Sequence, residues 1–246
     1  MTPNWLERTE LLIKTEGVAQ LQKSHVLVVG LGGVGSYAAE FLARAGVGAL
    51  TIVDGDVVDA TNCNRQLIAL TSTVAMPKVA VMQQRILDIN PHINLTAIQQ
   101  FIAPNDVAAL LARSHYDYII EAIDSLKPKL TLIETAYRKK IKIISSMGAG
   151  GKINPTLVQI TDISKTTECK LAKYTRKRLK KAGISKGIKV VFSPEPPDKS
   201  SLKHTNSTLY KKSYYGTISY IPALFGLHAA AEVVQHLLKK AKNEHS

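Results

Sequence analysis

Acidic and cationic side chains between residues 54 and 124 form a set that suits chemistry on a phosphoanhydride. The acids are Asp54, Asp56 and Asp124, and the cations are Arg65 and Lys78. Carboxylate oxygens can hold Mg²⁺ beside bound phosphates. Cations stabilise the negative charge that develops as pyrophosphate leaves, whereas a redox dinucleotide needs none because its phosphates are not cleaved. The set therefore favours ATP over a nicotinamide cofactor.

A glycine-rich turn ahead of these acids predicts where the phosphates bind. Gly30, Gly32 and Gly35 match G-x-G-x-x-G, and Gly33 lies within the motif. The three motif glycines permit a tight turn, a close approach of backbone to phosphate, and packing of the next helix on the sheet. That helix would direct its free N–H groups and positive dipole end at phosphate. Asp54 would accept hydrogen bonds from ribose hydroxyls. A purely structural turn is the alternative.

The pattern of apolar residues predicts the elements that position this set. Strands are expected at Val26–Val29, Leu50–Val53, Asn94–Ile98, Tyr118–Ala122 and Lys142–Ser145. Helices are expected at Val34–Ala45, Pro77–Asp88, Asn105–Ala112 and Lys127–Lys139. This alternation predicts an α/β fold, a Rossmann-like doubly wound, mainly parallel sheet with helices on both faces. Asp124 should then emerge at the carboxyl edge of the sheet to hold magnesium, or else cap the next helix.

We expect the whole chain, residues 1–246, to form a single ATP-binding domain of three parts. These are an N-terminal helix (1–24), a nucleotide-binding core (25–150) and a basic substrate-binding extension (151–246). The extension should contain a strand at Leu157–Thr161, a Pro/Ser-rich loop at Ser193–Ser207 and a closing helix at Pro222–Leu238.

The charge of the chain indicates a polyanionic partner. The formal net charge is +13 and the isoelectric point is near 9.7. An even lysine bias with solvated faces is the alternative, but the charge is clustered between Lys165 and Lys189. Leu171 and Leu179 would dock this stretch as a helix by one edge. The side chains expected to contact RNA are Lys173, Arg176, Lys177, Arg178, Lys180 and Lys181.

Cysteine usage and hydropathy predict a protein of the reducing cytoplasm. Cys63 and Cys169 are the two cysteines, and they show no disulfide or metal spacing. Both are expected to be packed residues, although Cys63 next to Arg65 could instead be a stabilised thiolate. No run of 18 apolar residues appears and the N-terminus lacks an apolar signal core, so we expect no membrane span.

Several segments together resemble a known family. VLVVGLGGVGS, TIVDGDVVDATNCNRQ, KVAVMQQRILDINP and YIIEAIDS resemble the ubiquitin-activating-enzyme-like superfamily, whose members adenylate a carboxylate with ATP. SMGAGGKINPTLVQITDISKT, KLAKYTRKRLKK and YGTISYIPALFGLHAA are similar to its branch of tRNA threonylcarbamoyladenosine dehydratases. The matches cover most of the chain from Arg8 to Leu238. The resemblance implies ATP and Mg²⁺ as cofactors and tRNA, modified at position 37, as substrate.

The resemblance also assigns roles to individual residues. It implies that the four glycines line the phosphate turn, that Asp54 binds ribose and that Asp124 holds magnesium. It places the remaining members of the set near the triphosphate: Asp56, Asn64, Arg65, Gln66 and Lys78. Arg65, Lys78 and Asp124 are the residues expected to act in catalysis.

The resemblance implies a homodimer and leaves alternatives open. In the sulfur-activating branch an N-terminal arginine reaches the partner's ATP; here Arg8 or Lys14 could take that role, because Leu11 stands at the usual position. That branch also carries two Cys-x-x-Cys zinc pairs, which two cysteines cannot supply. A sulfur-transfer protein is a candidate partner. Alternative functions are adenylation of a ubiquitin-like sulfur carrier, nicotinamide redox chemistry and non-catalytic tRNA binding.

Overall fold

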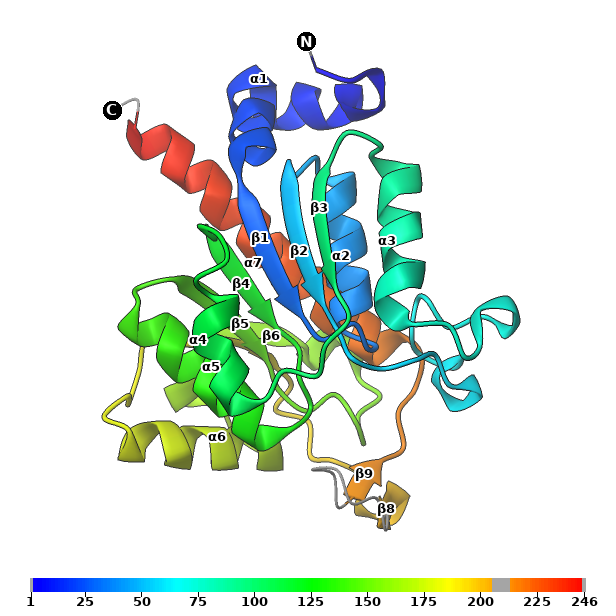
Figure 1. Ribbon diagram of the computed structural model, residues 1–246. Helices are drawn as coiled ribbons and strands as arrows, with labels where there is room; N and C mark the ends of the chain where they lie inside the picture. The colour runs from blue at the N-terminus through cyan, green and yellow to red at the C-terminus, as the bar shows by residue number, and fades with distance from the viewer. Residues whose placement is uncertain (1, 205–212, 245–246) are drawn as a thin grey trace.

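A seven-stranded sheet organises the computed structural model, which describes residues 2–204 and 213–244, with side chains to residue 240 (Figure 1). Within these residues the strand order is β3-β2-β1-β4-β5-β7-β6. The bounds are β1 His25–Val29, β2 Ala49–Val53, β3 Asn94–Ile98, β4 Tyr118–Glu121, β5 Lys142–Ser146, β6 Gln159–Asp162 and β7 Lys189–Phe192. Neighbouring strands are parallel except for the antiparallel pair β6 and β7. The predicted mainly parallel, doubly wound sheet is confirmed.

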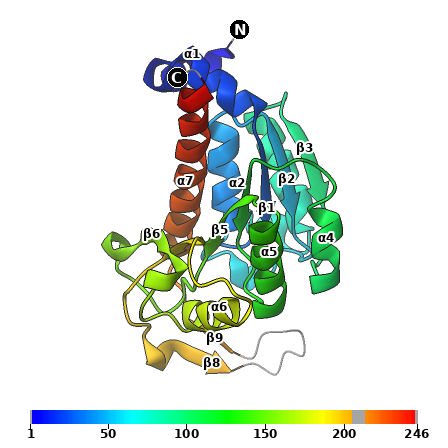
Figure 2. The same cartoon turned by 90° about the vertical axis from the view of Figure 1, so that its left-hand side faces the viewer.

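Helices cover both faces of the sheet, as expected for a doubly wound fold (Figure 2). Their bounds are α1 Glu7–Lys23, α2 Gly35–Arg44, α3 Lys78–Ile89, α4 Val107–Leu110, α5 Leu126–Arg138, α6 Lys170–Lys181 and α7 Tyr220–Glu244. Successive residues of a strand point to opposite faces of the sheet, and each face has its own hydrophobic core. Val28 lies in the same core as Leu42 of α2, and Leu27 lies in the same core as Leu132 of α5. Helices α2, α3 and α7 therefore lie on one face, and α4, α5 and α6 lie on the other.

Short 3-10 helices and one hairpin complete the described chain. The 3-10 helices are Asn4–Leu6, Ala60–Asn62, Thr71–Thr73, Pro104–Asp106, Pro155–Leu157, Ile163–Lys165 and Lys199–Ser201. The hairpin pairs β8 (Leu202–His204) with β9 (Ser213–Tyr215). The prediction of a loop over Ser193–Ser207 is therefore wrong at β8, and Thr205–Ser207 lie outside the described residues. Strand propensity alone does not predict β8, because its pairing with β9 outweighs the polar, Ser-rich composition of the segment.

Element boundaries agree with the sequence for the central strands and differ where turns begin. The strand predicted at Leu157–Thr161 is shifted to Gln159–Asp162, because Pro155–Leu157 forms a 3-10 turn whose N-cap, Asn154, accepts the Thr156 N–H at 3.0 Å. The helix predicted at Asn105–Ala112 contains only Val107–Leu110 as α-helix, after a 3-10 turn.

The N-terminal helix α1 is bent at Lys14, whose φ of 65° and ψ of 170° are not helical. Figure 1 shows α1 at the end of the sheet where β1 begins, away from the glycine turn that follows β1. Leu11 and Leu12 on α1 are 69% and 81% exposed, which leaves an apolar surface there. Their exposure is compatible with an interface, and the homodimer stays a prediction.

The closing helix α7 is longer than predicted and packs closely against α2. A Cβ on Gly226 would lie 2.4 Å from the Val34 carbonyl oxygen, so this crossing of α7 over α2 requires glycine. The stretch Tyr220–Lys240 is also long and apolar enough to cross a membrane, with a mean hydropathy of 1.3. Because 44% of that stretch is buried in the fold, it fits a core helix equally well, and the absence of a membrane span stays a prediction.

A buried ion pair joins α5 to the carboxyl end of β4. Lys129 and Glu121 are both fully buried, with Lys129 Nζ 2.5 Å from Glu121 Oε2. Lys129 also donates to the Ser146 carbonyl at 2.8 Å, and Glu121 Oε1 accepts the Ile123 N–H at 2.7 Å. Two strand ends and the loop that leads to Asp124 are thereby held together.

Replacing Lys129 by Ala should destabilise the protein by about 3–5 kcal/mol, because Glu121 would remain as a buried, unpaired charge. The free energy of unfolding in urea measures the loss. Lys127→Ala removes an exposed lysine from the same helix and should change stability by less than about 0.5 kcal/mol. Equal effects of the two substitutions would contradict a structural role for the buried pair.

Candidate nucleotide-binding site

The glycine turn lies where the strand order reverses, between the carboxyl ends of β2, β1 and β4. The Gly30 N–H donates to the Val53 carbonyl at 2.8 Å. Gly30 has a φ of +93°, and a Cβ there would lie 2.8 Å from the Ala122 carbonyl oxygen. The turn is therefore wedged between two strand ends, and glycine is required by both conformation and space. Open α/β sheets bind ligands at this kind of switch point.

The other glycines of the motif fall into two groups by the space around them. A Cβ on Gly35 would lie 1.7 Å from the Gly30 carbonyl oxygen, and a Cβ on Gly33 would lie 2.9 Å from Pro222 Cβ. Both positions are closed by the protein itself. Around Gly32 the nearest atom would be Gln66 Nε2 at 3.9 Å, so nothing in the fold requires glycine there. The open side of Gly32 fits the backbone approach that a phosphate needs.

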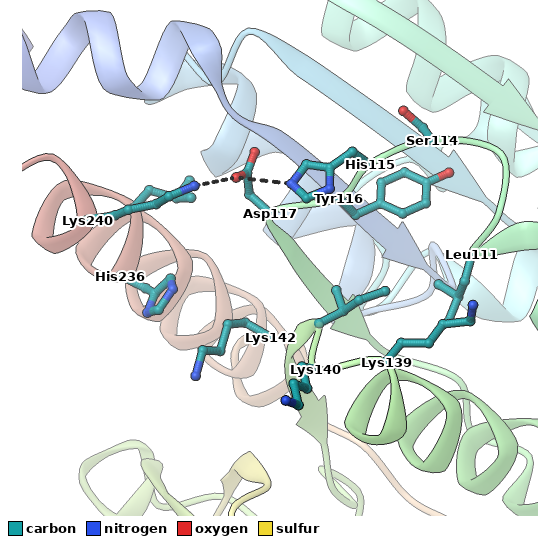
Figure 3. A pocket seen from close by; sticks show the side chains of 12 residues that line it. Leu111, Ser114, His115, Tyr116, Asp117, Lys139, Lys140, Lys142, His236 and Lys240 are labelled. Carbon is teal, nitrogen blue, oxygen red and sulfur yellow. Dashed lines mark hydrogen bonds and ion pairs between the residues drawn. The ribbon is translucent and has the colours of Figure 1, made fainter. Parts of the chain in front are cut away.

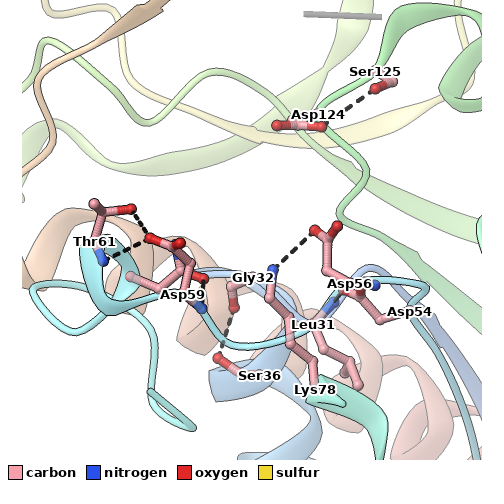
Figure 4. A network of polar contacts seen from close by, with 11 residues as sticks. Leu31, Gly32, Ser36, Asp54, Asp56, Asp59, Thr61, Lys78, Asp124 and Ser125 are labelled. Carbon is pink, nitrogen blue, oxygen red and sulfur yellow. Dashed lines mark hydrogen bonds and ion pairs between the residues drawn. The ribbon is translucent and has the colours of Figure 1, made fainter. Parts of the chain in front are cut away.

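Asp54, directly after β2, is fixed by backbone donors at the turn. Its Oδ2 accepts the Leu31 N–H at 2.6 Å, and its Oδ1 accepts the Asp56 N–H at 2.8 Å (Figure 4). Burial raises the pKa of the Asp54 carboxyl, and the Lys78 ammonium and the two N–H donors act against that rise. The contact with Leu31 holds a carboxylate against the glycine turn, where the sequence predicts ribose binding.

Lys78, at the first position of α3, is a buried cation beside this carboxylate. Its Nζ donates to Asp56 Oδ2 at 3.0 Å, while its side chain is 6% exposed and that of Asp56 is 52% exposed. The backbone N–H of Lys78 also donates to the Asp56 carbonyl at 3.0 Å. The structure thus brings Asp54, Asp56 and Lys78 together, as the resemblance implies (Figure 4).

The Asn64-Arg65-Gln66 triplet joins the turn to the segment that precedes α7. Asn64 Nδ2 donates to the Thr217 carbonyl at 2.8 Å, and Arg65 Nη1 donates to Asn64 Oδ1 at 2.8 Å. Gln66 is 8% exposed, and its Oε1 has no hydrogen-bond partner among the described residues. This buried carbonyl oxygen is an acceptor that a ligand donor would satisfy, and the Nε2 atom of the same side chain is the one nearest to Gly32.

Asp124 lies on the loop after β4, opposite the glycine turn in Figure 4. The N-cap of α5 is Ser125, which makes no side-chain cap bond and donates instead to Asp124 Oδ1 at 3.4 Å. The N-cap position itself is therefore Ser125 rather than Asp124. Among the described residues, no group of three His, Cys, Asp or Glu side chains could hold a metal alone. Magnesium bound through one carboxylate and phosphates needs no such group, so its role stays a prediction.

Helix α6 carries the basic stretch on a docked edge, as predicted. Leu179 is fully buried and Leu171 is half-buried. Arg176 differs from the other cations of the stretch, because its half-buried Nη1 donates to the Thr166 carbonyl at 2.8 Å and also to Thr166 Oγ1. The remaining five are exposed to solvent: Lys173, Lys177, Arg178, Lys180 and Lys181. They form a cationic surface, and RNA binding by the six residues stays a prediction.

Lys152 joins two segments of the extension to each other, and the sequence did not single it out. It is 3% exposed, and its Nζ donates to the Ser193 carbonyl at 3.1 Å and to the Glu195 carbonyl. Burial lowers the pKa of this ammonium. The neighbouring Gly151 N–H donates to the Gly216 carbonyl at 2.8 Å, one residue before the Thr217 carbonyl that Asn64 reaches.

The two cysteines differ in solvent exposure, which the sequence alone could not predict. Cys63 is exposed at the end of a short 3-10 helix, so the expectation that it is packed is wrong, whereas Cys169 is buried as expected.

The sequence reasoning did not predict the Glu121–Lys129 ion pair, although the sequence contains signals for it. Glu121 interrupts an apolar strand, and Lys129 lies on the helical stripe of Leu132 and Ile133, where a lysine must find a buried partner.

The fold and the site together define a nucleotide-binding protein of the doubly wound α/β class. The ThiF family matches residues 6–246 of the chain. The tRNA threonylcarbamoyladenosine dehydratase of Bacillus subtilis (strain 168) is 42% identical, with 94% of each chain covered. Its namesake from Haemophilus influenzae is 39% identical, with 93% and 91% covered. The crystal structure of the E. coli tRNA N6-threonylcarbamoyladenosine dehydratase in complex with ATP superposes with a TM-score of 0.87, at 36% identity and 98% coverage of both chains.

The chain belongs to the ThiF family, in the branch of the tRNA threonylcarbamoyladenosine dehydratases. The family named from the sequence is confirmed. The open side of Gly32 leaves space for a phosphate, and nucleotide binding by these particular residues stays a prediction.

Gly32→Ala should leave the fold intact and weaken ATP binding by at least about tenfold, because the new methyl group occupies the space that a phosphate needs and removes about two backbone hydrogen bonds. Isothermal titration gives the affinity and thermal unfolding gives the stability. Gly35→Ala is the contrasting variant: its Cβ would strike the Gly30 carbonyl, so the folded protein itself should be lost. Normal ATP affinity in stable Gly32→Ala would show that the turn is only structural.

Proposed function

We propose that this protein catalyses the ATP-dependent dehydration of threonylcarbamoyladenosine at position 37 of tRNA, which closes a ring in the modified side chain. The observation that carries the proposal is the likeness along nearly the whole chain to a dehydratase solved with ATP, joined to a glycine turn with one open position. The sulfur-carrier alternative is not favoured, because the relatives that match the whole chain are named dehydratases.

Dehydration proceeds in two displacements with a balanced set of atoms. The threonyl carboxylate first attacks the α-phosphate of ATP, and pyrophosphate leaves. A nucleophile within the same side chain then attacks the activated carbonyl, and AMP leaves with one former carboxylate oxygen. The net change in the nucleoside is the loss of one water. Because the second step is intramolecular, it benefits from an effective concentration that reaches about 10⁵ M or more in well-oriented cases.

The chain supplies cations and donors for the first displacement. The N–H groups at the open turn around Gly32 hold phosphate, and Asp54 binds the ribose. Lys78 and Arg65 stabilise the charge that develops on the departing pyrophosphate. Asp124 would hold Mg²⁺, which supplies further charge neutralisation on the phosphates. The Asp56 contact keeps the Lys78 ammonium extended at the site.

The exposed cations of α6 supply the electrostatic attraction for RNA. Phosphate contacts by Lys and Arg provide affinity that does not depend on base sequence and that weakens with salt. The hydrogen bond from Asn64 to the Thr217 carbonyl supports an extension that reaches the proposed ATP site. A substrate held on α6 can thereby present its modified loop to the nucleotide.

Further parts of the proposal concern assembly and location. We place the protein in the cytoplasm as a homodimer, in which Arg8 or Lys14 of one copy reaches the ATP of the other. The position of α1 away from its own glycine turn supports action across a dimer rather than within one chain. A sulfur-transfer protein is a candidate partner. The division into an N-terminal helix, a nucleotide-binding core and a basic extension also remains part of the proposal.

Purified protein incubated with Mg²⁺, ATP and tRNA bearing threonylcarbamoyladenosine should remove one water from that nucleoside, with AMP formed in equal amount. Mass spectrometry of digested nucleosides measures the change. Arg65→Gln and Asp124→Asn should each lower kcat by about 10²- to 10³-fold, as removal of a charge-stabilising group does elsewhere.

Cys63→Ala is the control, because an exposed cysteine that forms no covalent intermediate should be dispensable. No mass change, with AMP formed only after a carrier protein is added, would move the assignment to sulfur-carrier adenylation. Full activity of both charge variants would refute the assigned roles.

A further inference from the structure

A cavity of about 630 Å³ opens at the amino edge of the sheet, opposite the edge that carries the glycine turn (Figure 3). Its rim carries four lysines from three elements: Lys139 and Lys140 follow α5, Lys142 begins β5, and Lys240 lies near the end of α7. Its floor includes the buried side chains of Tyr116 and Leu237. The lining of this cavity contains none of the residues assigned to the ATP site of the same chain.

The rim is positively charged and only partly neutralised. Asp117, the acid in the lining, accepts from Lys240 at 3.2 Å and has His115 Nε2 at 4.0 Å. Lys139, Lys140 and Lys142 are exposed and form no ion pair with any described residue. Three positive charges that no described acidic side chain pairs with therefore surround one hollow, which favours a ligand with several phosphates.

Lys140 adopts a backbone conformation that glycine would adopt more readily. Its φ is +58°, at the position after α5 where the Ile141 N–H returns to the Ala136 carbonyl at 2.9 Å. Helices that end this way usually have glycine at that position, because other residues are strained there. A lysine held in a strained conformation beside other unpaired lysines points to a role for its side chain.

Two simpler explanations of this lysine cluster account for fewer of the observations. Cations after α5 would interact favourably with its negative dipole end, but that explains neither Lys142 on a strand nor the strain at Lys140. A small free ligand would need converging buried hydrogen-bonding groups. In the lining, Ser114 Oγ contacts His25 Nδ1 at 3.1 Å, and both Asp117 oxygens already accept hydrogen bonds. Charge without such groups suits a phosphate backbone.

The end of α5, next to the cavity, contacts the end of α6. Arg138, the last residue of α5, donates through Nη2 to the Ala182 carbonyl at 3.4 Å, directly after the basic residues Lys180 and Lys181. The five-residue strand β5 spans about 15–20 Å between the two edges. A structured RNA that contacts α6 can bridge this distance with the ribose-phosphate backbone next to its modified loop.

We propose that this cavity is a second phosphate-binding site, which takes the ribose-phosphate backbone of the tRNA outside its modified loop; this rests on the proposed function. Lys139, Lys140 and Lys142 provide the charge. The site contributes affinity and selects structured tRNA over isolated loop sequences, without touching the reacting atoms.

The test uses the triple variant Lys139→Gln, Lys140→Gly and Lys142→Gln in full-length protein. Its Kd for unmodified full-length tRNA should rise by about tenfold or more, and the slope of log affinity against log salt should become shallower by about two to three. Affinity for a short single-stranded RNA with only the loop sequence, and kcat on modified tRNA, should stay unchanged. The control for Lys142→Gln is Arg44→Gln, which removes one charge at the end of α2 outside the cavity lining and should match wild type in tRNA affinity.

Lys140→Gly alone separates binding from stability. Glycine relieves the left-handed strain, so the Tm should hold or rise while tRNA affinity falls. Unchanged tRNA affinity in the triple variant, or equal losses for tRNA and the short RNA, would overturn the proposal. The proposal would also be overturned if the triple variant lost binding to anionic lipid vesicles or inorganic triphosphate but bound tRNA as wild type does. If wild type turns over no tRNA, the proposed function fails separately, and the binding comparison still decides this site.

Discussion

The close approach of the α2 N-terminus to three strand ends is the constraint on which the rest of the structure depends. Gly35 leaves no room for a Cβ beside the Gly30 carbonyl, and Gly30 leaves none beside Ala122. This contact fixes the phosphate turn against β4 and, through the Gly30–Val53 hydrogen bond, against β2. Asp54 follows β2 directly and Asp124 lies on the loop after β4, so both carboxylates lie at the edge that this packing fixes. The site is therefore set by main-chain geometry more than by its side chains.

Cations at this site are held by partners that do not fully neutralise them. Lys78 contacts Asp56, whose carboxylate is half in solvent, and Arg65 contacts neutral oxygens of Thr61 and Asn64. Because Asp56 is half in solvent and the Arg65 partners carry no charge, incoming phosphates can compete for both cations. The side chains are thus extended before ATP arrives and remain able to bind it. Such preorganisation is where electrostatic catalysis gains most.

Much of this arrangement could be predicted from sequence, because local patterns determine it. Apolar strands followed by glycine or aspartate indicate both the parallel sheet and its carboxyl edge. Contacts between distant segments could not be predicted in the same way. The pairing of Glu121 with Lys129, the turn of Arg176 toward Thr166 and the pairing of β8 with β9 depend on tertiary packing. The exposure of Cys63 likewise depends on how its turn lies on the surface. The periodicity of apolar residues predicts which face of a helix or strand is buried, but it does not predict which other element packs against that face.

The measurement that tests carboxylate adenylation most directly is oxygen-isotope transfer. Threonylcarbamoyladenosine in tRNA would be prepared with ¹⁸O in both threonyl carboxylate oxygens and incubated with the protein, Mg²⁺ and ATP. The account predicts one ¹⁸O in the phosphate of each AMP formed and one in the cyclic nucleoside, with none in pyrophosphate. Unlabelled AMP together with cyclised, singly labelled nucleoside would show that the carboxylate never bonds to the α-phosphate, and would contradict the mechanism.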